Sequence, residues 1–159
     1  MIFRKNKKVA TEITAFLSVS KRYRTSHRKG TIVILDSGQD TFEFLSYLRD
    51  QCKLDLNLVL AHTPKQAETV IEDAEQIRAI IVQSSVFHGV GNIDTFLSWL
   101  TEEHHEVPVW VNACDATLEA RIHSLFKSVC IIPSTKPRLS LIKSIGLPDI
   151  CITAAARYS

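Results

Sequence analysis

Residues 77–92 read IRAIIVQSSVFHGVGN, and this stretch decides the fold of the chain. The apolar residues at its start form an almost continuous run, which is typical of a strand buried on both faces in the middle of a parallel sheet. In an open α/β sheet the carboxyl ends of the central strands face the ligand crevice, so catalytic groups are expected directly after such a run. The residues there are Gln83, Ser84 and Ser85, and none of them is an acid.

Four further apolar runs lie along the chain, at residues 31–35, 54–60, 107–111 and 129–132. Each of the five runs is followed by a segment with apolar residues at helical spacing, which predicts five amphipathic helices. Alternating strands and helices, with crossovers long enough for a parallel return, predict an α/β three-layer sandwich. The expected architecture is flavodoxin-like, with a five-stranded parallel sheet of order 2-1-3-4-5.

The expected helices have recognisable starts and buried faces. Asp40, Thr63 before Pro64, Asn92 and Asp115 favour the N-cap position, and each stands at the start of a helical pattern. The predicted buried faces, helix by helix, are Phe42, Phe44, Leu45 and Leu48; Ala67, Val70, Ile71 and Ala74; Ile93, Phe96, Leu97 and Leu100; Leu118, Ile122, Leu125 and Phe126; and Leu139, Ile142 and Ile145.

The composition bounds the class of protein. The 159 residues suit one domain that buries roughly two thirds of the surface of its unfolded chain, so neither disulfides nor a metal are needed for stability. No apolar run has the length of a membrane-spanning helix. The four cysteines, at positions 52, 114, 130 and 151, lack the spacing of a metal site, which predicts reduced thiols in a cytoplasmic protein, with Cys130 buried.

The charge is distributed unevenly along the chain. Residues 1–30 carry nine basic side chains against Glu12 alone, while the remainder has ten basic and sixteen acidic residues and a net charge of −6. Such a basic arm is expected to pack on its own domain or on a second subunit, or to contact nucleic acid or an acidic membrane surface, and a targeting peptide is a further alternative. The basic residues are Arg4, Lys5, Lys7, Lys8, Lys21, Arg22, Arg24, Arg28 and Lys29. Between them a short amphipathic helix is predicted from Val9, Ile13, Phe16 and Leu17.

Three short motifs resemble a response-regulator receiver domain over residues 31–146. Residues 34–37 (ILDS) lie at the end of the first strand, residues 107–113 (VPVWVNA) at the fourth, and residues 135–137 (TKP) after the fifth. The resemblance implies the CheY-like form of the fold and a role in signalling. It divides the chain into the basic arm (1–29), a receiver-like domain (30–147) and a C-terminal tail (148–159).

Receiver chemistry requires an acidic cluster that holds magnesium, an aspartate that accepts the phosphoryl group, a hydroxyl and a lysine. The resemblance places these positions at Asp36, Ser37, Ser84, Asn112 and Lys136, with Gln83 in place of Ser84 if the register differs by one residue. Ser37 and Asn112 depart from the acid and the hydroxyl that the chemistry needs.

These departures predict a degenerate pseudo-receiver that takes up no phosphoryl group. Neither serine nor glutamine forms the acyl phosphate, and one carboxylate binds magnesium weakly without a second. Asp36 and Lys136 can equally be a turn residue and a surface lysine. The run EEHHE at residues 102–106 lacks the i, i+4 spacing of a metal-binding helix face. We therefore expect no enzymatic activity, no metal and no cofactor.

Three functional hypotheses remain open. In the first, the domain acts in regulation through protein–protein contacts or self-association, using the fourth and fifth helices and the arm. In the second, the chain is a stand-alone or truncated amino-terminal wing of a PLP-dependent ornithine, lysine or arginine decarboxylase with an assembly role, because such wings are receiver-like and residues 152–159 resemble their exit helix. In the third, the arm binds nucleic acid nonspecifically.

Overall fold

The computed structural model describes residues 30–88, 90–113, 115–133 and 137–158. The basic arm with its predicted amphipathic helix, Cys114 and Lys136 lie outside these described residues. Among the residues described, no helix has the length and apolar character needed to cross a membrane.

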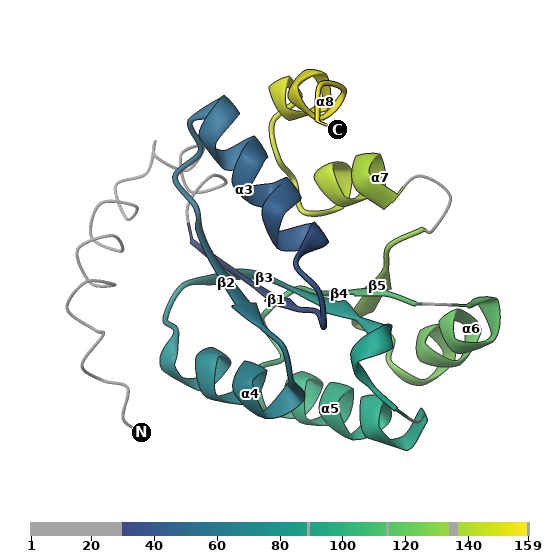
Figure 1. Ribbon diagram of the computed structural model, residues 1–159. Coiled ribbons are helices and arrows are strands. Elements are labelled where there is room, and N and C mark those ends of the chain that lie inside the picture. Colours follow the sequence, from purple (N-terminus) through teal and green to yellow (C-terminus); the bar gives the residue numbers. More distant parts are fainter. Residues whose placement is uncertain (1–29, 89, 114, 134–136, 159) are drawn as a thin grey trace.

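The sheet has five parallel strands in the order β2-β1-β3-β4-β5, as the sequence predicts. The stretch that decides the fold forms the central strand β3, which lies between β1 and β4 (Figure 1). The strands are β1 (Thr31–Leu35), β2 (Asn57–Ala61), β3 (Ile77–Gln83), β4 (Val109–Asn112) and β5 (Val129–Ile131).

Helices cover both faces of the sheet and complete the three layers (Figure 1). On one face lie α3 (Asp40–Cys52), α7 (Pro137–Ser144) and α8 (Ile150–Ala155). On the other lie α4 (Pro64–Asp73), α5 (Val90–Glu103) and α6 (Ala116–Leu125), and the short 3-10 helix η2 (Ser84–Val86) follows β3 directly.

The core is divided by the sheet into two clusters because successive side chains of a strand point to opposite faces. On β3, Ala79 and Ile81 pack with the α3–α7–α8 layer, and Ile80 and Val82 pack with the α4–α5–α6 layer. All four side chains are at most 2% exposed. Burying an isoleucine or valine to this extent stabilises the fold by about 1.5–3 kcal/mol per side chain, so this strand anchors both layers.

The ends of several elements differ from the prediction. Strand β2 begins at Asn57 and not at residue 54, although Leu54 and Leu56 are buried before it. Leu125, predicted in the core, is 52% exposed because it is the last residue of α6, beyond the part of the helix that packs on the sheet. Cys130, predicted to be buried, is exposed because β5 is the edge strand and Cys130 points to the face opposite to Val129 and Ile131, which pack on the α4–α5–α6 side.

Two of the four predicted helix caps are confirmed and two are wrong. Thr63 and Asp115 accept hydrogen bonds from the backbone N–H groups three residues ahead, over 3.1 and 2.8 Å. Asp40 is instead the first residue of α3, where Gln39 precedes it without a side-chain cap. Asn92 lies inside α5, because that helix starts two residues earlier at Val90.

The C-terminal tail contains the helix α8, which spans Ile150–Ala155 where the sequence predicts a helix over residues 152–159, and this helix packs on α3. Cys151 and Ala154 are buried in the same cluster as the α3 side chains. The turn between α7 and α8 passes through Gly146, whose φ of +73° favours glycine. Arg78 of β3 reaches this turn and donates two hydrogen bonds from Nη2, to the carbonyl oxygens of Ile145 at 2.9 Å and Gly146 at 3.0 Å.

Candidate functional site

Three polar residues at the carboxyl ends of the strands lie side by side in one row. Leu35 and Val82 are register partners, so Asp36 follows β1 opposite the point where Gln83 ends β3. Gln83 is in turn the register partner of Asn112 at the end of β4. Register partners in a parallel sheet point to the same face, so all three side chains lie on the α3–α7–α8 side.

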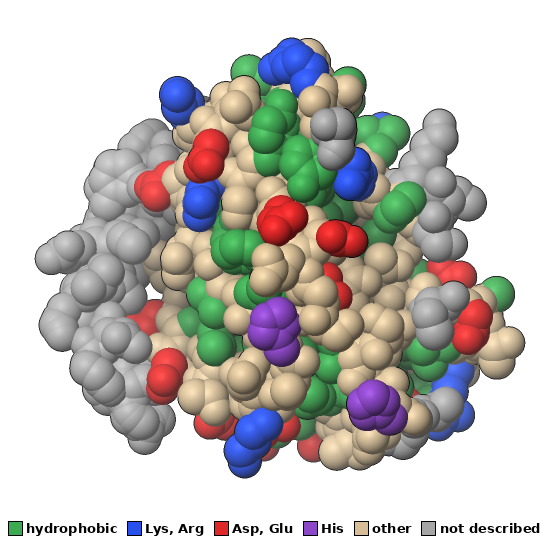
Figure 2. Space-filling model, in the orientation of Figure 1, with side chains coloured by type: hydrophobic (Ala, Val, Ile, Leu, Met, Phe, Trp, Pro, Cys, Tyr) green, Lys and Arg blue, Asp and Glu red, His purple; other side chains and the backbone are tan. Residues whose placement is uncertain are grey.

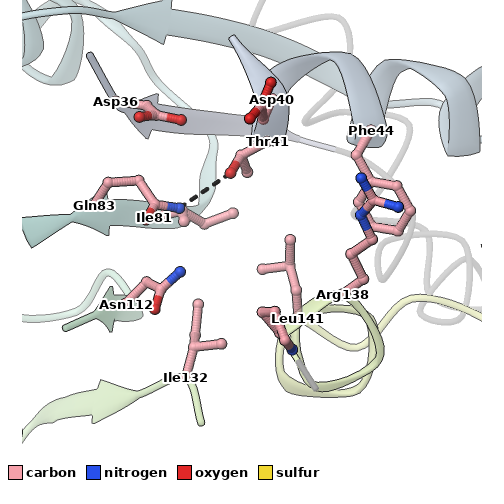
Figure 3. Close-up of a pocket in the computed structure, with 11 residues that line it drawn as sticks. Asp36, Asp40, Thr41, Phe44, Ile81, Gln83, Asn112, Ile132, Arg138 and Leu141 are labelled. Carbon is pink, nitrogen blue, oxygen red and sulfur yellow. Dashed lines mark hydrogen bonds between the residues drawn. The ribbon is translucent and has the colours of Figure 1, made fainter. Parts of the chain in front are cut away.

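These residues line an open pocket of about 360 Å³ between the sheet edge, α3 and α7 (Figure 3). The apolar part of its wall consists of Ile81, Ile132 and Leu141, with Phe44 from α3 and Pro137 at the start of α7. The polar part adds Asp40, Thr41 and Arg138 to the row of three. Small-molecule sites are typically built in this way, as an apolar cleft with a few convergent polar groups.

Asp36 is the most enclosed polar group of the pocket, with an exposed fraction of only 9%. Its Oδ1 accepts a hydrogen bond of 3.1 Å from the Gly38 N–H, which closes a tight turn after β1. Its backbone carbonyl accepts from His62 Nδ1 at 2.9 Å. A carbonyl oxygen can only accept, so this bond places the ring proton of neutral His62 on Nδ1.

Gln83 is held in the pocket by a hydrogen bond of 3.0 Å from its Nε2 to Thr41 Oγ1 (Figure 3). The neighbouring Ser84 lies beyond the end of β3 and does not line the pocket. Ser84 is 5% exposed and opens the 3-10 helix η2.

Arg138 lies at the rim of the pocket against aromatic rings. Its guanidinium carbon is 5.2 Å from the ring centroid of Phe44 and 4.7 Å from that of Tyr158, which is cation–π geometry. Tyr158 also packs on Phe44 and Tyr47, so it holds Arg138 beside α3 without lining the pocket itself. Figure 2 shows the same face, with acidic side chains near its middle and basic and hydrophobic side chains above them.

The structure thus brings together two of the predicted site residues, Asp36 and Asn112, with Gln83 as the alternative to Ser84. Ser37 is exposed and does not line the pocket. Sequence reasoning missed Asp40, Thr41 and Arg138 as site residues. Asp40 and Thr41 could have been found, because the first turn of a helix that follows the first strand lies above the carboxyl edge of the sheet.

The chemical groups of the pocket are two carboxylates, two carboxamides, a hydroxyl and a guanidinium. Within the described ranges, no group of three or more histidine, cysteine, aspartate or glutamate side chains could hold a metal ion. The pocket is therefore suited to hydrogen bonding and to binding of a charged group. Its described lining residues include no nucleophile paired with a base.

No protein-family model and no curated protein sequence matches the chain. Solved structures do match it. A receiver domain of a Clostridium thermocellum histidine kinase is 18% identical, with a TM-score of 0.56 over 74% of this chain and 98% of that one. The chemotaxis response regulator CheY4 of Vibrio cholerae is 11% identical, with a TM-score of 0.58 over 74% and 96% of the two chains. The chain has the fold of a response-regulator receiver domain.

An uncharacterized protein from Neptuniibacter caesariensis shares this receiver fold with a TM-score of 0.60 and 15% identity, over 80% of this chain and 90% of that one. In the receiver fold the pocket described above occupies the carboxyl edge of the strands, where the fold class places ligands. The predicted CheY-like architecture is therefore confirmed.

Proposed function

We propose that this chain is a cytoplasmic, non-phosphorylatable receiver-like domain that acts in signalling or regulation through protein contacts. The observation that carries the proposal is the carboxamide of Gln83, which lies in the pocket beside Asp36 at the end of the central strand. A receiver uses a carboxylate at this place to form the acyl phosphate. A carboxamide cannot take that role, because its nitrogen is a poor nucleophile and its oxygen carries no charge.

The other groups of the pocket support the same proposal. Asn112, in the same row, supplies an amide where receiver chemistry needs a hydroxyl. Ser37 has a hydroxyl where the second acid of the magnesium pair is expected, and its side chain is exposed. Without the acceptor and with one magnesium ligand of the pair missing, we expect the covalent step to be lost and the neutralisation of the phosphoryl charge to be weakened.

Regulation without phosphorylation requires a surface that binds a partner while the domain is unphosphorylated. Leu125 at the end of α6 is 52% exposed and Ile150 at the start of α8 is 60% exposed. Cys130 is exposed on the edge strand β5. Leu125 and Cys130 support contacts through the side that carries α6 and β5, near the fourth helix named in the sequence prediction, and Ile150 adds an exposed apolar group on α8.

The test is incubation of the purified full-length chain with magnesium and a small phosphodonor such as acetyl phosphate, followed by intact-mass measurement. The expected result is that this chain forms no base-labile phosphoryl adduct. The Vibrio cholerae CheY4 protein is incubated in parallel as the positive control. A stoichiometric phosphoryl adduct on any aspartate would overturn the proposal, with Asp36 and Asp40 as the residues to inspect first.

A further inference from the structure

We infer that residues 148–158 form a detachable strap, which positions part of the pocket wall while it is docked and uncovers an apolar surface of α3 when it leaves. The inference rests on the proposed function, because a domain that is regulated without phosphorylation needs another element with two states. A local opening of the strap, with the rest of the domain folded, supplies such an element.

The first observation is the way in which the strap is attached. Within the described residues, each backbone-to-backbone hydrogen bond of the strap stays inside the strap, such as that from the Cys151 N–H to the Pro148 carbonyl at 2.9 Å. The chain directly before it is fixed, because the Leu147 N–H donates to the Ile142 carbonyl at 3.0 Å. Helix α8 has six residues, too few for a stable helix in water on its own. The strap is therefore held by its side chains, and it can leave without breaking a backbone hydrogen bond to the sheet or to the other helices.

The second observation is the surface that the strap covers. Cys151 is fully buried and Ala154 is 1% exposed, and both belong to the core cluster that contains Phe44, Leu45 and Leu48 of α3. Figure 1 shows α8 next to α3 and α7, on the outer side of this layer. When the strap leaves, this part of α3 loses its cover. A contiguous apolar surface of this kind is typical of a protein-binding site.

The third observation is that the strap contacts two residues of the pocket wall. The ring centroid of Tyr158 lies 5.2 Å from that of Phe44 and 5.0 Å from that of Tyr47, and the guanidinium carbon of Arg138 lies 4.7 Å from it. Phe44 and Arg138 both line the pocket (Figure 3). Release of Tyr158 therefore takes away one of the two rings that hold Arg138 at the pocket rim.

Cys151 gives a direct measure of strap release, because its thiol is buried while the strap is docked. The full-length protein is treated with excess iodoacetamide in a mildly alkaline buffer, and peptide mass spectrometry gives the alkylation rate of each cysteine. Cys130 is exposed and serves as the internal reference for the reagent. We expect Cys151 to react more slowly than Cys130, yet faster than global unfolding allows.

Asp115→Ala separates strap release from global unfolding. It removes the cap of α6, on the opposite face of the sheet from α8, and should lower the ratio of folded to unfolded protein about fivefold. The Cys151 rate should stay unchanged in this variant, because local release leaves α6 in place. A rise of about fivefold at Cys151 would show that the thiol is reached through global unfolding, and the inference would be wrong.

Tyr158→Ala tests the hold of the strap on α3. It should raise the Cys151 rate at least about tenfold, because it removes two aromatic pairs and one cation–π contact. Tyr158→Phe keeps the ring and should react at the wild-type rate. An unchanged rate in Tyr158→Ala would contradict the inference.

Arg138→Gln tests the link between the pocket wall and the strap, and it should raise the Cys151 rate about threefold through the lost cation–π contact. The matched control is Arg157→Gln, since Arg157 is exposed in the strap and has no ring contact within the described ranges. Equal rates in these two variants would overturn the link. The phosphodonor test above is read from the mass of the wild-type chain, so failure of the strap and failure of the proposed function are distinguishable.

Discussion

Gln83 and Thr41 join the central strand to the first helix through one hydrogen bond of 3.0 Å between Nε2 and Oγ1. Thr41 lies in the first turn of α3, and Gln83 ends β3, so the two residues are 42 positions apart in the chain. The bond fixes the orientation of the Gln83 carboxamide, which we propose to stand in place of the phospho-acceptor of a receiver. It therefore links the stability of the fold to the geometry of the pocket.

Thr41→Val should lower the free energy of unfolding by about 1–2 kcal/mol, because it keeps the shape of the side chain and leaves the partly buried Gln83 amide without its acceptor. Urea denaturation followed by circular dichroism measures the change. Thr117→Val is the matched control, since Thr117 is also the second residue of its helix but is exposed and makes no side-chain hydrogen bond within the part of the chain that the structure describes. Equal losses in the two variants would show that the bond contributes nothing.

Arg78→Met should destabilise the protein by about 2–3 kcal/mol, because it removes two charge-assisted hydrogen bonds to the carbonyl oxygens of Ile145 and Gly146. Burial lowers the pKa of this guanidinium, which nevertheless stays protonated at neutral pH. Methionine keeps most of the hydrocarbon stem, so the loss reports on the hydrogen bonds. Relative to the wild type, the amide hydrogen-exchange rate of the Arg78→Met variant should increase most at the α7–α8 turn.

The control for Arg78→Met is Arg49→Met, at the end of α3. Arg49 is two thirds buried but bonds only to the adjacent, exposed Asp50 over 3.3 Å. Exposed pairs of this kind contribute about 0–1 kcal/mol, so we expect a small change. A loss as large as that of Arg78→Met would mean that removal of any arginine stem accounts for the effect.

The two kinds of predicted cap should respond differently to alanine. Asp115→Ala should cost about 1 kcal/mol, because Asp115 Oδ1 accepts from the Leu118 N–H at the start of α6. Asn92→Ala should be neutral or stabilise by a few tenths of a kcal/mol, roughly the difference in helix propensity, because Asn92 lies inside α5. Thermal unfolding of both variants measures this contrast, and a cost of Asn92→Ala equal to that of Asp115→Ala would contradict the position of the helix start.

The fold could be predicted from the sequence because burial on both faces leaves continuous apolar runs, and the strand order follows from right-handed crossovers. The ends of elements could not, because they depend on contacts distant in the chain. Leu125 has the spacing of a core residue, yet α6 ends where the sheet no longer covers it.

For the site, too, the sequence predicted the region of the sheet but not which residues enter the pocket. Polar residues after three strands predicted a site at the carboxyl edge, but the choice between Gln83 and Ser84 depended on a register of one residue. The structure decides which of them enters the pocket, because side chains alternate and Gln83 shares the face of Asp36 and Asn112. Arg138 had no sequence signal, since its place depends on the rings of Phe44 and Tyr158.

The basic arm gives a prediction that concerns charge alone. Residues 1–29 lie outside the described structure, but their nine basic side chains stand against a remainder with a net charge of −6. Deleting them should abolish a salt-sensitive self-association or the retention of an anionic partner such as nucleic acid. Light scattering and nucleic-acid retention at low and high salt measure the two effects. A variant that keeps residues 1–29 but has the nine basic residues changed to glutamine separates the effect of charge from that of length. If neither the deletion nor this variant changes self-association or nucleic-acid retention, the basic residues of the arm have no binding role.

Two substitutions should restore the uptake of a phosphoryl group. The double variant Ser37→Asp/Gln83→Asp places a second acid beside Asp36 and a carboxylate in the pocket row, where the register puts Gln83 next to Asn112. With magnesium and acetyl phosphate it should form a base-labile acyl phosphate that the wild type does not form, although only in part, because Asn112 still replaces the hydroxyl. Ser37→Asp/Ser84→Asp is the matched control. It has the same charge, but position 84 does not line the pocket, so this variant should take up no phosphoryl group, provided that circular dichroism confirms that it is folded. Phosphorylation of this control and not of the Gln83 variant would show that the acceptor position is Ser84, and that the row of Asp36, Gln83 and Asn112 has no relation to receiver chemistry.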